Sequence, residues 1–129
     1  MRVLAVDPGD VRIGLAISDP LGLVARPLSV ITHTRRLEDA QRIVDLALEH
    51  QVASILVGVP YDQNGEIGPQ ARKSLRLADE IQSNTELPVI IWDESGSTDK
   101  AVKFSSDDNL LDAHAAAFIL QDYLDVQSS

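Results

Sequence analysis

The sequence predicts an α/β fold in which a five-stranded mixed sheet carries helices on both faces. Three apolar runs of strand length occupy residues 1–31, and two more then alternate with segments of helical periodicity. Strands that follow one another at hairpin distance pair antiparallel, whereas strands joined through helices pair in parallel. Strands one to three are therefore expected to be antiparallel and strands four and five parallel, in a single domain spanning residues 1–129.

The first strand is expected over residues 3–6 and ends at Asp7, because a proline and a glycine follow and turn the chain. A near-continuous apolar run without polar alternation is typical of a central strand. The second strand, residues 13–17, follows at hairpin distance. The third is expected within residues 21–31, at an edge or interrupted, because Pro27 cannot donate a ladder hydrogen bond.

The later elements follow from apolar periodicity, caps and breakers. Residues 54–59 form a continuous apolar run, which is typical of a buried strand that pairs in parallel, so this segment is expected to be the fourth strand. The expected elements are a helix from Leu37 to about Gln51 capped by Thr34, a central strand over 54–59, a helix from Pro69, a strand over 87–92, at most a short helix within 99–104, a helix from about Leu110 to Tyr123, and a fraying end over 126–129.

The chain of 129 residues has no cysteine and no apolar run long enough to span a membrane. The lack of cysteine excludes disulfides, thiolate zinc sites and cysteine nucleophiles, and fits a reducing compartment. No charged and then apolar leader precedes the first strand. We therefore expect a cytoplasmic protein without a membrane partner, as a monomer or weak homodimer.

Twenty acids against eleven bases give a net charge of −9, which opposes nucleic acid at long range. Residues 93–129 hold eight acids and only two bases, so an anion-binding face is expected within the first 92 residues. The cationic side chains there are interpreted by their place on the predicted helices. Those of the first helix, Arg35, Arg36 and Arg42, are interpreted as its solvated face, whereas Arg72, Lys73 and Arg76 in the first turns of the second helix can face a polyanion or the solvent equally well.

Three acids lie where strands end or the last helix begins: Asp7, Glu94 and Asp112. Asp112 belongs to the helix stripe that faces the sheet, a costly place for a carboxylate unless something compensates it. In the predicted topology the first and fourth strands are neighbours, the fifth lies beyond the fourth, and the last helix crosses their ends, so the three acids can meet. The simpler interpretation of Asp7 alone is an ordinary Asp-Pro-Gly turn.

Clustered carboxylates repel one another unless a divalent cation lies among them, and hard oxygen ligands are those that Mg²⁺ or Mn²⁺ prefers. Two such ions would activate a water and stabilise the leaving oxygen of a phosphodiester. The acids therefore indicate metal-dependent chemistry on a phosphate ester.

Four stretches resemble the YqgF family, also called RuvX, of ribonuclease H-like proteins described as pre-16S ribosomal RNA nucleases and Holliday-junction resolvase-like enzymes. The resemblance covers nearly the whole chain, and its first and last stretches are specific in combination. The stretches are residues 7–22, residues 57–60 with the downstream Gly65 and Ala71, Asp93-Glu94 followed by Ser97-Thr98, and residues 112–124.

The resemblance implies a ribonuclease H-like fold and a divalent-metal-dependent nuclease acting on structured RNA or branched DNA. It places the catalytic acids, which would also hold Mg²⁺ or Mn²⁺, on Asp7, Glu94 and Asp112. The expected substrate-binding residues are the basic side chains Arg12, Arg72, Lys73 and Arg76.

The sequence departs from the family pattern at two places that carry positive charge. The family usually reads Asp-Glu-Arg-Leu-Ser-Thr after the fifth strand, whereas Ser95 and Gly96 follow Glu94 here. The segment before the last helix, residues 99–111, is short and holds only two lysines. Both departures lower the expected affinity for a nucleic-acid backbone more than they lower the expected affinity for a metal ion.

Two other function classes remain open. The departures favour a binding protein that keeps the fold and has lost cleavage, whereas the three retained acids oppose it. Asp7 and Gly9 on a hairpin also resemble the first phosphate motif of actin-like ATPases, which need two such domains to enclose ATP. Trp92 is expected in the core, although it could stack on a base. His114 is expected to point away from Asp112 on the helix.

Overall fold

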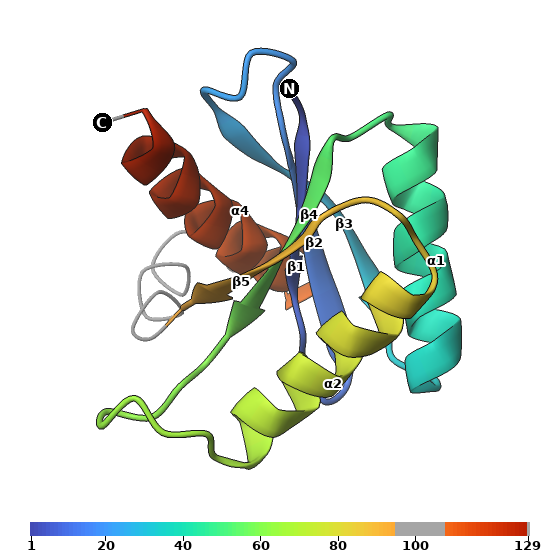
Figure 1. Cartoon of the computed structure of the whole chain (residues 1–129), viewed down its shortest axis with the longest axis vertical. Helices are drawn as coiled ribbons and strands as arrows, with labels where there is room; N and C mark the ends of the chain where they lie inside the picture. Colours follow the sequence, from blue (N-terminus) through green and yellow to red (C-terminus); the bar gives the residue numbers. More distant parts are fainter. Residues whose placement is uncertain (95–107, 129) are drawn as a thin grey trace.

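Five strands form one mixed sheet in the order β3-β2-β1-β4-β5 (Figure 1). The computed structural model describes residues 1–94 and 108–128, so the short helix expected within 99–104 lies outside the described residues. The elements are β1 (Val3–Asp7), β2 (Arg12–Ser18), β3 (Ala25–Thr32), α1 (Arg36–Glu49), β4 (Ser54–Val59), α2 (Pro69–Ser83), β5 (Val89–Asp93) and α4 (Asp108–Gln127).

The pairing directions confirm the predicted sheet. β1 pairs antiparallel with β2, and β2 pairs antiparallel with β3. β1 also pairs in parallel with β4, and β4 pairs in parallel with β5. β1 is thus the central strand, as expected. β1, β3, β4 and β5 all run in one direction, so their carboxyl ends lie along the same edge of the sheet.

The two faces of the sheet are covered by different helices, with α4 on one side and α1 and α2 on the other (Figure 1). Successive residues of β1 point to opposite faces because the side-chain period of a strand is two. Leu4 and Val6 pack in the cluster with α1 and α2, whereas Val3 and Ala5 pack in the cluster with α4. By the same alternation, Asp7 lies on the α4 face.

Pro27 lies on β3, at an edge of the sheet, opposite Ala16, next to a register shift between Leu15 and Ala16. This confirms the expected edge position, where a missing backbone donor is tolerated. β3 begins only at Ala25, later than expected. The preceding residues form a turn in which the Asp19 carboxylate accepts hydrogen bonds from the backbone N–H groups of residues 23 and 24 at 2.7 and 2.9 Å.

The ends of two helices differ from the expectation. The prediction of Thr34 as the cap of α1 is wrong: the helix begins at Arg36, Arg35 takes the cap position without a side-chain bond, and the Thr34 hydroxyl donates to Glu38 at 2.9 Å. α4 begins at Asp108 and continues to Gln127, so it includes two of the residues expected to fray. No helix within the described ranges is both long and apolar enough to cross a membrane.

Candidate active site at the carboxyl end of the central strand

Asp7 ends β1 between two strands that carry glycine beside it. On β2, Gly14 is the direct partner of Asp7. On β4, Gly58 lies one residue beyond the pair formed by Val6 and Val57. Neither neighbour has a side chain, so the sheet is open on both sides of the Asp7 carboxylate, and other groups can approach it there.

Glu94 reaches this opening from the end of β5. Its backbone N–H donates to the carbonyl of Val59 at 3.2 Å, which extends the β4–β5 pairing by one step. A Cβ at Gly58 would lie 3.0 Å from both Cδ and Oε2 of Glu94, so the absent side chain leaves the space that the carboxyl group fills. Glu94 is only 4% exposed, and its Oε2 has no hydrogen-bond partner among the residues that the structure describes.

Asp112 enters from α4, which lies directly on β2. A Cβ at Gly14 would lie 1.8 Å from the backbone oxygen of Asp112, an impossible distance, so the helix can pack this closely only over glycine. Arg12, at the start of β2, donates from Nε to Oδ2 of Asp112 at 2.8 Å. The glycine contact and the ion pair together fix the first turns of α4 beside the end of β1.

The pKa values report that the three acids influence one another. Burial raises the pKa of Asp7, a hydrogen bond with Glu94 lowers it, and the charge of Asp112 raises it, so the net pKa is about 6. Burial also raises the pKa of Glu94 to about 9, with contributions from the charge of Asp7, the hydrogen bond to Asp7, and the charge of Asp93. The two carboxyl groups therefore titrate as a coupled pair that binds a proton more tightly than isolated carboxylates do.

This arrangement fits a divalent cation. The donor set consists of hard carboxylate oxygens, one of which is buried without a partner, and positive charge nearby would relieve the cost of ionising both Asp7 and Glu94. Within residues 1–94 and 108–128, however, no three acidic or histidine side chains are already arranged around one ion position. Asp112 turns an oxygen to Arg12 instead.

The four basic residues expected to bind substrate lie in different places. Arg12 pairs with Asp112 at the acid cluster. Lys73 and Arg76 line a pocket on the opposite face of the sheet, between α1 and α2, and Arg72 is exposed outside that pocket.

Two more arginines, Arg35 and Arg36, line the same pocket, and both are exposed, in agreement with their interpretation as a solvated helix face. Their position immediately after the third strand could have identified them, because that strand ends at the same sheet edge as β1.

Trp92 serves packing rather than the site. Its ring meets that of Tyr123 edge to face, with centroids 5.3 Å apart and an interplanar angle of 87°. Both side chains pack against the buried cluster under α4. The expectation of a core position is confirmed, and His114, half-buried on α4, stays without an assigned role.

Two kinds of sequence comparison agree. The chain matches the model of a family described as "RuvX: Holliday junction resolvase" over residues 1–126. A protein of Thermoanaerobacter pseudethanolicus named "Putative pre-16S rRNA nuclease" is 35% identical over 138 residues, covering 100% of this chain and 99% of that protein. A protein of the same name from Desulforamulus reducens is 38% identical over 133 residues, covering 97% of each chain.

Solved structures share the fold. RuvC of T. thermophilus in complex with a Holliday junction substrate superimposes with a TM-score of 0.61 at 17% identity, covering 100% of this chain and 96% of that one. Fowlpox virus resolvase in complex with Holliday junction DNA gives a TM-score of 0.61 at 11% identity, with both chains fully covered. The ribonuclease H-like fold predicted from the resemblance is confirmed, and the chain belongs to the RuvX family of Holliday junction resolvases.

Proposed function

We propose that this protein is a metal-dependent nuclease that cleaves phosphodiesters in structured nucleic acid, with Asp7, Glu94 and Asp112 as its catalytic acids. The proposal is supported by the buried pair of Asp7 and Glu94 at one sheet edge, whose pKa values are raised by burial, and by the charge of Asp112, which acts on Asp7. Membership of a family whose relatives carry nuclease names supports the same reaction class.

The acids have distinct parts in this proposal. Asp7, on the rigid central strand, and Asp112, on α4, would hold the metal, and Glu94 would share a second ion or orient the attacking water. Bound Mg²⁺ or Mn²⁺ would activate a water and stabilise the leaving oxygen. A cation held by Asp7 and Glu94 would favour the ionised form of both carboxyl groups, because a ligating carboxylate must be ionised.

The substrate lies over the arginine-bearing part of the chain, with Arg12 nearest the acids and Arg72, Lys73 and Arg76 farther along the same edge. Arg12 keeps Asp112 in place through the bond from its Nε to Oδ2 of Asp112, and its positive charge favours a phosphate nearby. The names of relatives favour precursor ribosomal RNA, and the solved neighbours bound to Holliday junctions favour branched DNA. Processing of ribosomal RNA would put this single-domain protein in the cytoplasm, as a monomer or weak homodimer.

The test is cleavage of precursor 16S RNA and of a four-way DNA junction at low salt with Mn²⁺, by the wild type and by Asp7→Asn. We expect the wild type to cut one of the two substrates and the variant to fall to background, because a ligand charge is lost at nearly constant volume. Equal cleavage by both proteins would contradict the proposed site. No cleavage by either would favour a binding protein that has lost catalysis, as the serine in place of the family's arginine after Glu94 suggests.

A further inference from the structure

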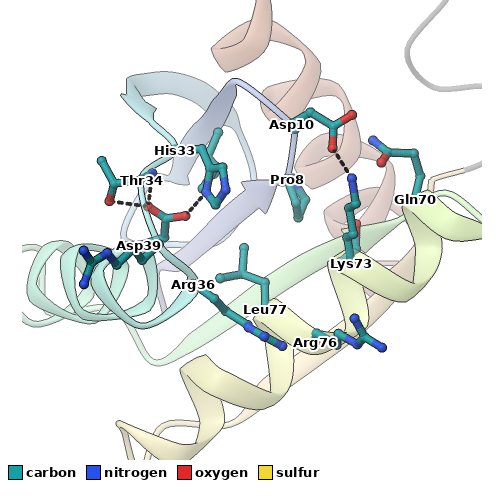
Figure 2. A pocket seen from close by; sticks show the side chains of 14 residues that line it. Pro8, Asp10, His33, Thr34, Arg36, Asp39, Gln70, Lys73, Arg76 and Leu77 are labelled. Atoms are coloured by element: carbon teal, nitrogen blue, oxygen red, sulfur yellow. Dashed lines mark hydrogen bonds and ion pairs between the residues drawn. The ribbon is translucent and has the colours of Figure 1, made fainter.

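A pocket of about 400 Å³ opens on the face of the sheet opposite the acid cluster. Side chains from three places converge on it: the β1–β2 turn, the corner between β3 and α1, and the first two turns of α2 (Figure 2). Pro8 and Leu77 form apolar parts of its wall. Four cationic side chains stand around it, Arg35, Arg36, Lys73 and Arg76.

The pocket carries unbalanced positive charge in a chain whose net charge is −9. The two carboxylates in its lining already have partners. Asp10 accepts a hydrogen bond from Lys73 Nζ at 3.0 Å. Asp39 is only 1% exposed and accepts hydrogen bonds from its own neighbours. The arginines differ. In the part of the chain that the structure describes, Arg35, Arg36 and Arg76 have neither an ion pair nor a side-chain hydrogen bond.

The wall formed by the β3–α1 corner is held rigidly by Asp39. Its carboxylate accepts hydrogen bonds from Nη2 of Arg42 at 2.8 Å, from the backbone N–H of Thr34 at 3.1 Å, and from Nδ1 of His33. These bonds keep the pKa of Asp39 below its ordinary value, although burial raises it. A buried carboxylate with three donors fixes the corner from which Arg35 and Arg36 extend.

The helix ends add to the charge. Neither α1 nor α2 has a side-chain N-cap bond. α2 begins with Pro69, which has no N–H, but its first turn holds no acid, so the positive end of its dipole lies beside the pocket, whereas Glu38 and Asp39 offset that of α1. Ser74, which is 2% exposed, brings a hydroxyl to the wall. These donors suit a phosphate group, and arginine matches its oxygens with paired N–H bonds.

The volume and the apolar wall indicate more than a bare phosphate. Pockets of roughly 300 Å³ or more accommodate small organic ligands, and such sites combine apolar surface with a few polar groups. Pro8 and Leu77 offer a surface for a sugar or base, while the arginines face the phosphate. A nucleotide has both an apolar base or sugar surface for Pro8 and Leu77 and a phosphate for the arginines.

The position of the pocket connects it to the acid cluster. Pro8, in the pocket wall, directly follows Asp7, whose side chain lies on the other face of the sheet. A nucleic-acid strand that crosses the β1–β2 turn would pass from one site to the other. We propose that the pocket between α1 and α2 binds one nucleotide of the substrate strand by its phosphate, outside the segment that is cut. This inference rests on the proposed function and adds a second contact for the same strand.

The test measures binding without metal or cleavage, so it is independent of the nuclease assay. Inorganic phosphate, adenosine monophosphate and a 5′-phosphorylated RNA pentanucleotide are titrated into ¹⁵N-labelled Asp7→Asn protein, in the presence and absence of the paired changes Arg36→Gln and Arg76→Gln. The matched control is Arg26→Gln, an exposed arginine near the opposite end of the sheet. Thermal melts establish that each variant is folded.

We expect the monophosphate and the pentanucleotide to shift the amide signals of residues 33–36 and 70–77. The paired variant should bind both at least about tenfold more weakly, since one charge-assisted hydrogen bond contributes about that factor. Arg26→Gln should bind within about twofold of its parent.

Three results would overturn the inference. If the paired variant binds the monophosphate and the pentanucleotide as tightly as its parent does, the pocket is excluded as the binding site. Phosphate bound as tightly as the monophosphate would exclude a nucleoside contact. Loss of monophosphate binding with unchanged pentanucleotide binding would assign the pocket to a free nucleotide rather than to substrate. Each result is readable whether or not the protein cleaves RNA or DNA.

Discussion

Gly14 and Gly58 flank Asp7 on its two neighbouring strands. At each position, part of another acidic residue occupies the space that a side chain would fill. Gly14 admits the backbone of Asp112, and Gly58 admits the side chain of Glu94. The site is thus defined by two missing side chains as well as by three carboxyl groups. A side chain at either position would act on one acid in particular.

Alanine at Gly58 tests the room made for Glu94. The new Cβ would lie 3.0 Å from the Glu94 carboxyl and 3.1 Å from Cδ1 of Ile119, so Gly58→Ala should displace Glu94 and cost about 1–3 kcal/mol of stability. We expect Mn²⁺ affinity, measured by calorimetry, to fall by about tenfold or more. Gly68→Ala is the control, because nothing lies within 4 Å of its Cβ position. Unchanged Mn²⁺ affinity in a folded Gly58→Ala protein would show that Glu94 is not a ligand of the metal.

The raised pKa of Asp7 predicts how the metal-free protein responds to pH. The pKa is about 6 in the folded chain against 3.8 for an unperturbed aspartate, so ionisation destabilises the folded state. The loss begins near pH 4 and is nearly complete by about pH 7, at about 3 kcal/mol. Asp7→Asn should therefore melt several degrees above the wild type at pH 8, and this difference should shrink at pH 4.5. A variant that is less stable than the wild type at pH 8 would contradict this electrostatic account.

At the scale of elements, α4 brings Asp112 to the proposed site by lying close to β2. The contact between the Asp112 backbone and Gly14 leaves no room for a Cβ, and the Arg12–Asp112 ion pair bridges the same two elements. Asp7 is positioned by the sheet itself, whereas Asp112 comes close to Asp7 only when α4 packs on β2.

Gly14→Ala should therefore affect the docking of the whole helix. A Cβ 1.8 Å from a backbone oxygen cannot be relieved by a side-chain rotation, so α4 must shift. We expect destabilisation of about 3 kcal/mol or more in urea unfolding, the upper range for overpacking. Gly68→Ala, under the same conditions, should change stability by less than about 1 kcal/mol. Equal stabilities of these two variants would show that α4 does not depend on the close approach.

At the scale of the whole molecule, the charge distribution sets how nucleic acid is bound. The chain is acidic, and the cationic side chains proposed to bind phosphate are few, so the proposed binding depends on few contacts. For three phosphate contacts, affinity should fall about 40-fold between 50 and 200 mM salt. Fluorescence anisotropy with Asp7→Asn and a labelled substrate measures this slope. A flat salt dependence would mean that binding does not use the phosphate backbone.

The sequence predicted the sheet order because it follows from local signals, apolar runs and breakers. The convergence of Asp7, Glu94 and Asp112 on one metal stays a prediction. The sequence could not predict the pairing of Arg12 with Asp112, since the two residues are a hundred positions apart and the contact depends on the close packing of α4. The pocket between α1 and α2 was missed for a similar reason. Arginine in a helix is ordinarily solvated, and only the tertiary fold brings Arg36 beside Arg76.

The central claim is that Asp7, Glu94 and Asp112 form one divalent-metal site, and Mn²⁺ titration by calorimetry tests it most directly. The proteins compared are the wild type, Asp7→Asn, Glu94→Gln and Asp112→Asn, with Asp45→Asn, on the exposed side of α1, as the control. The account predicts that each of the three site variants weakens Mn²⁺ binding by about tenfold or more while Asp45→Asn binds like the wild type. Wild-type affinity retained in all three site variants would contradict it.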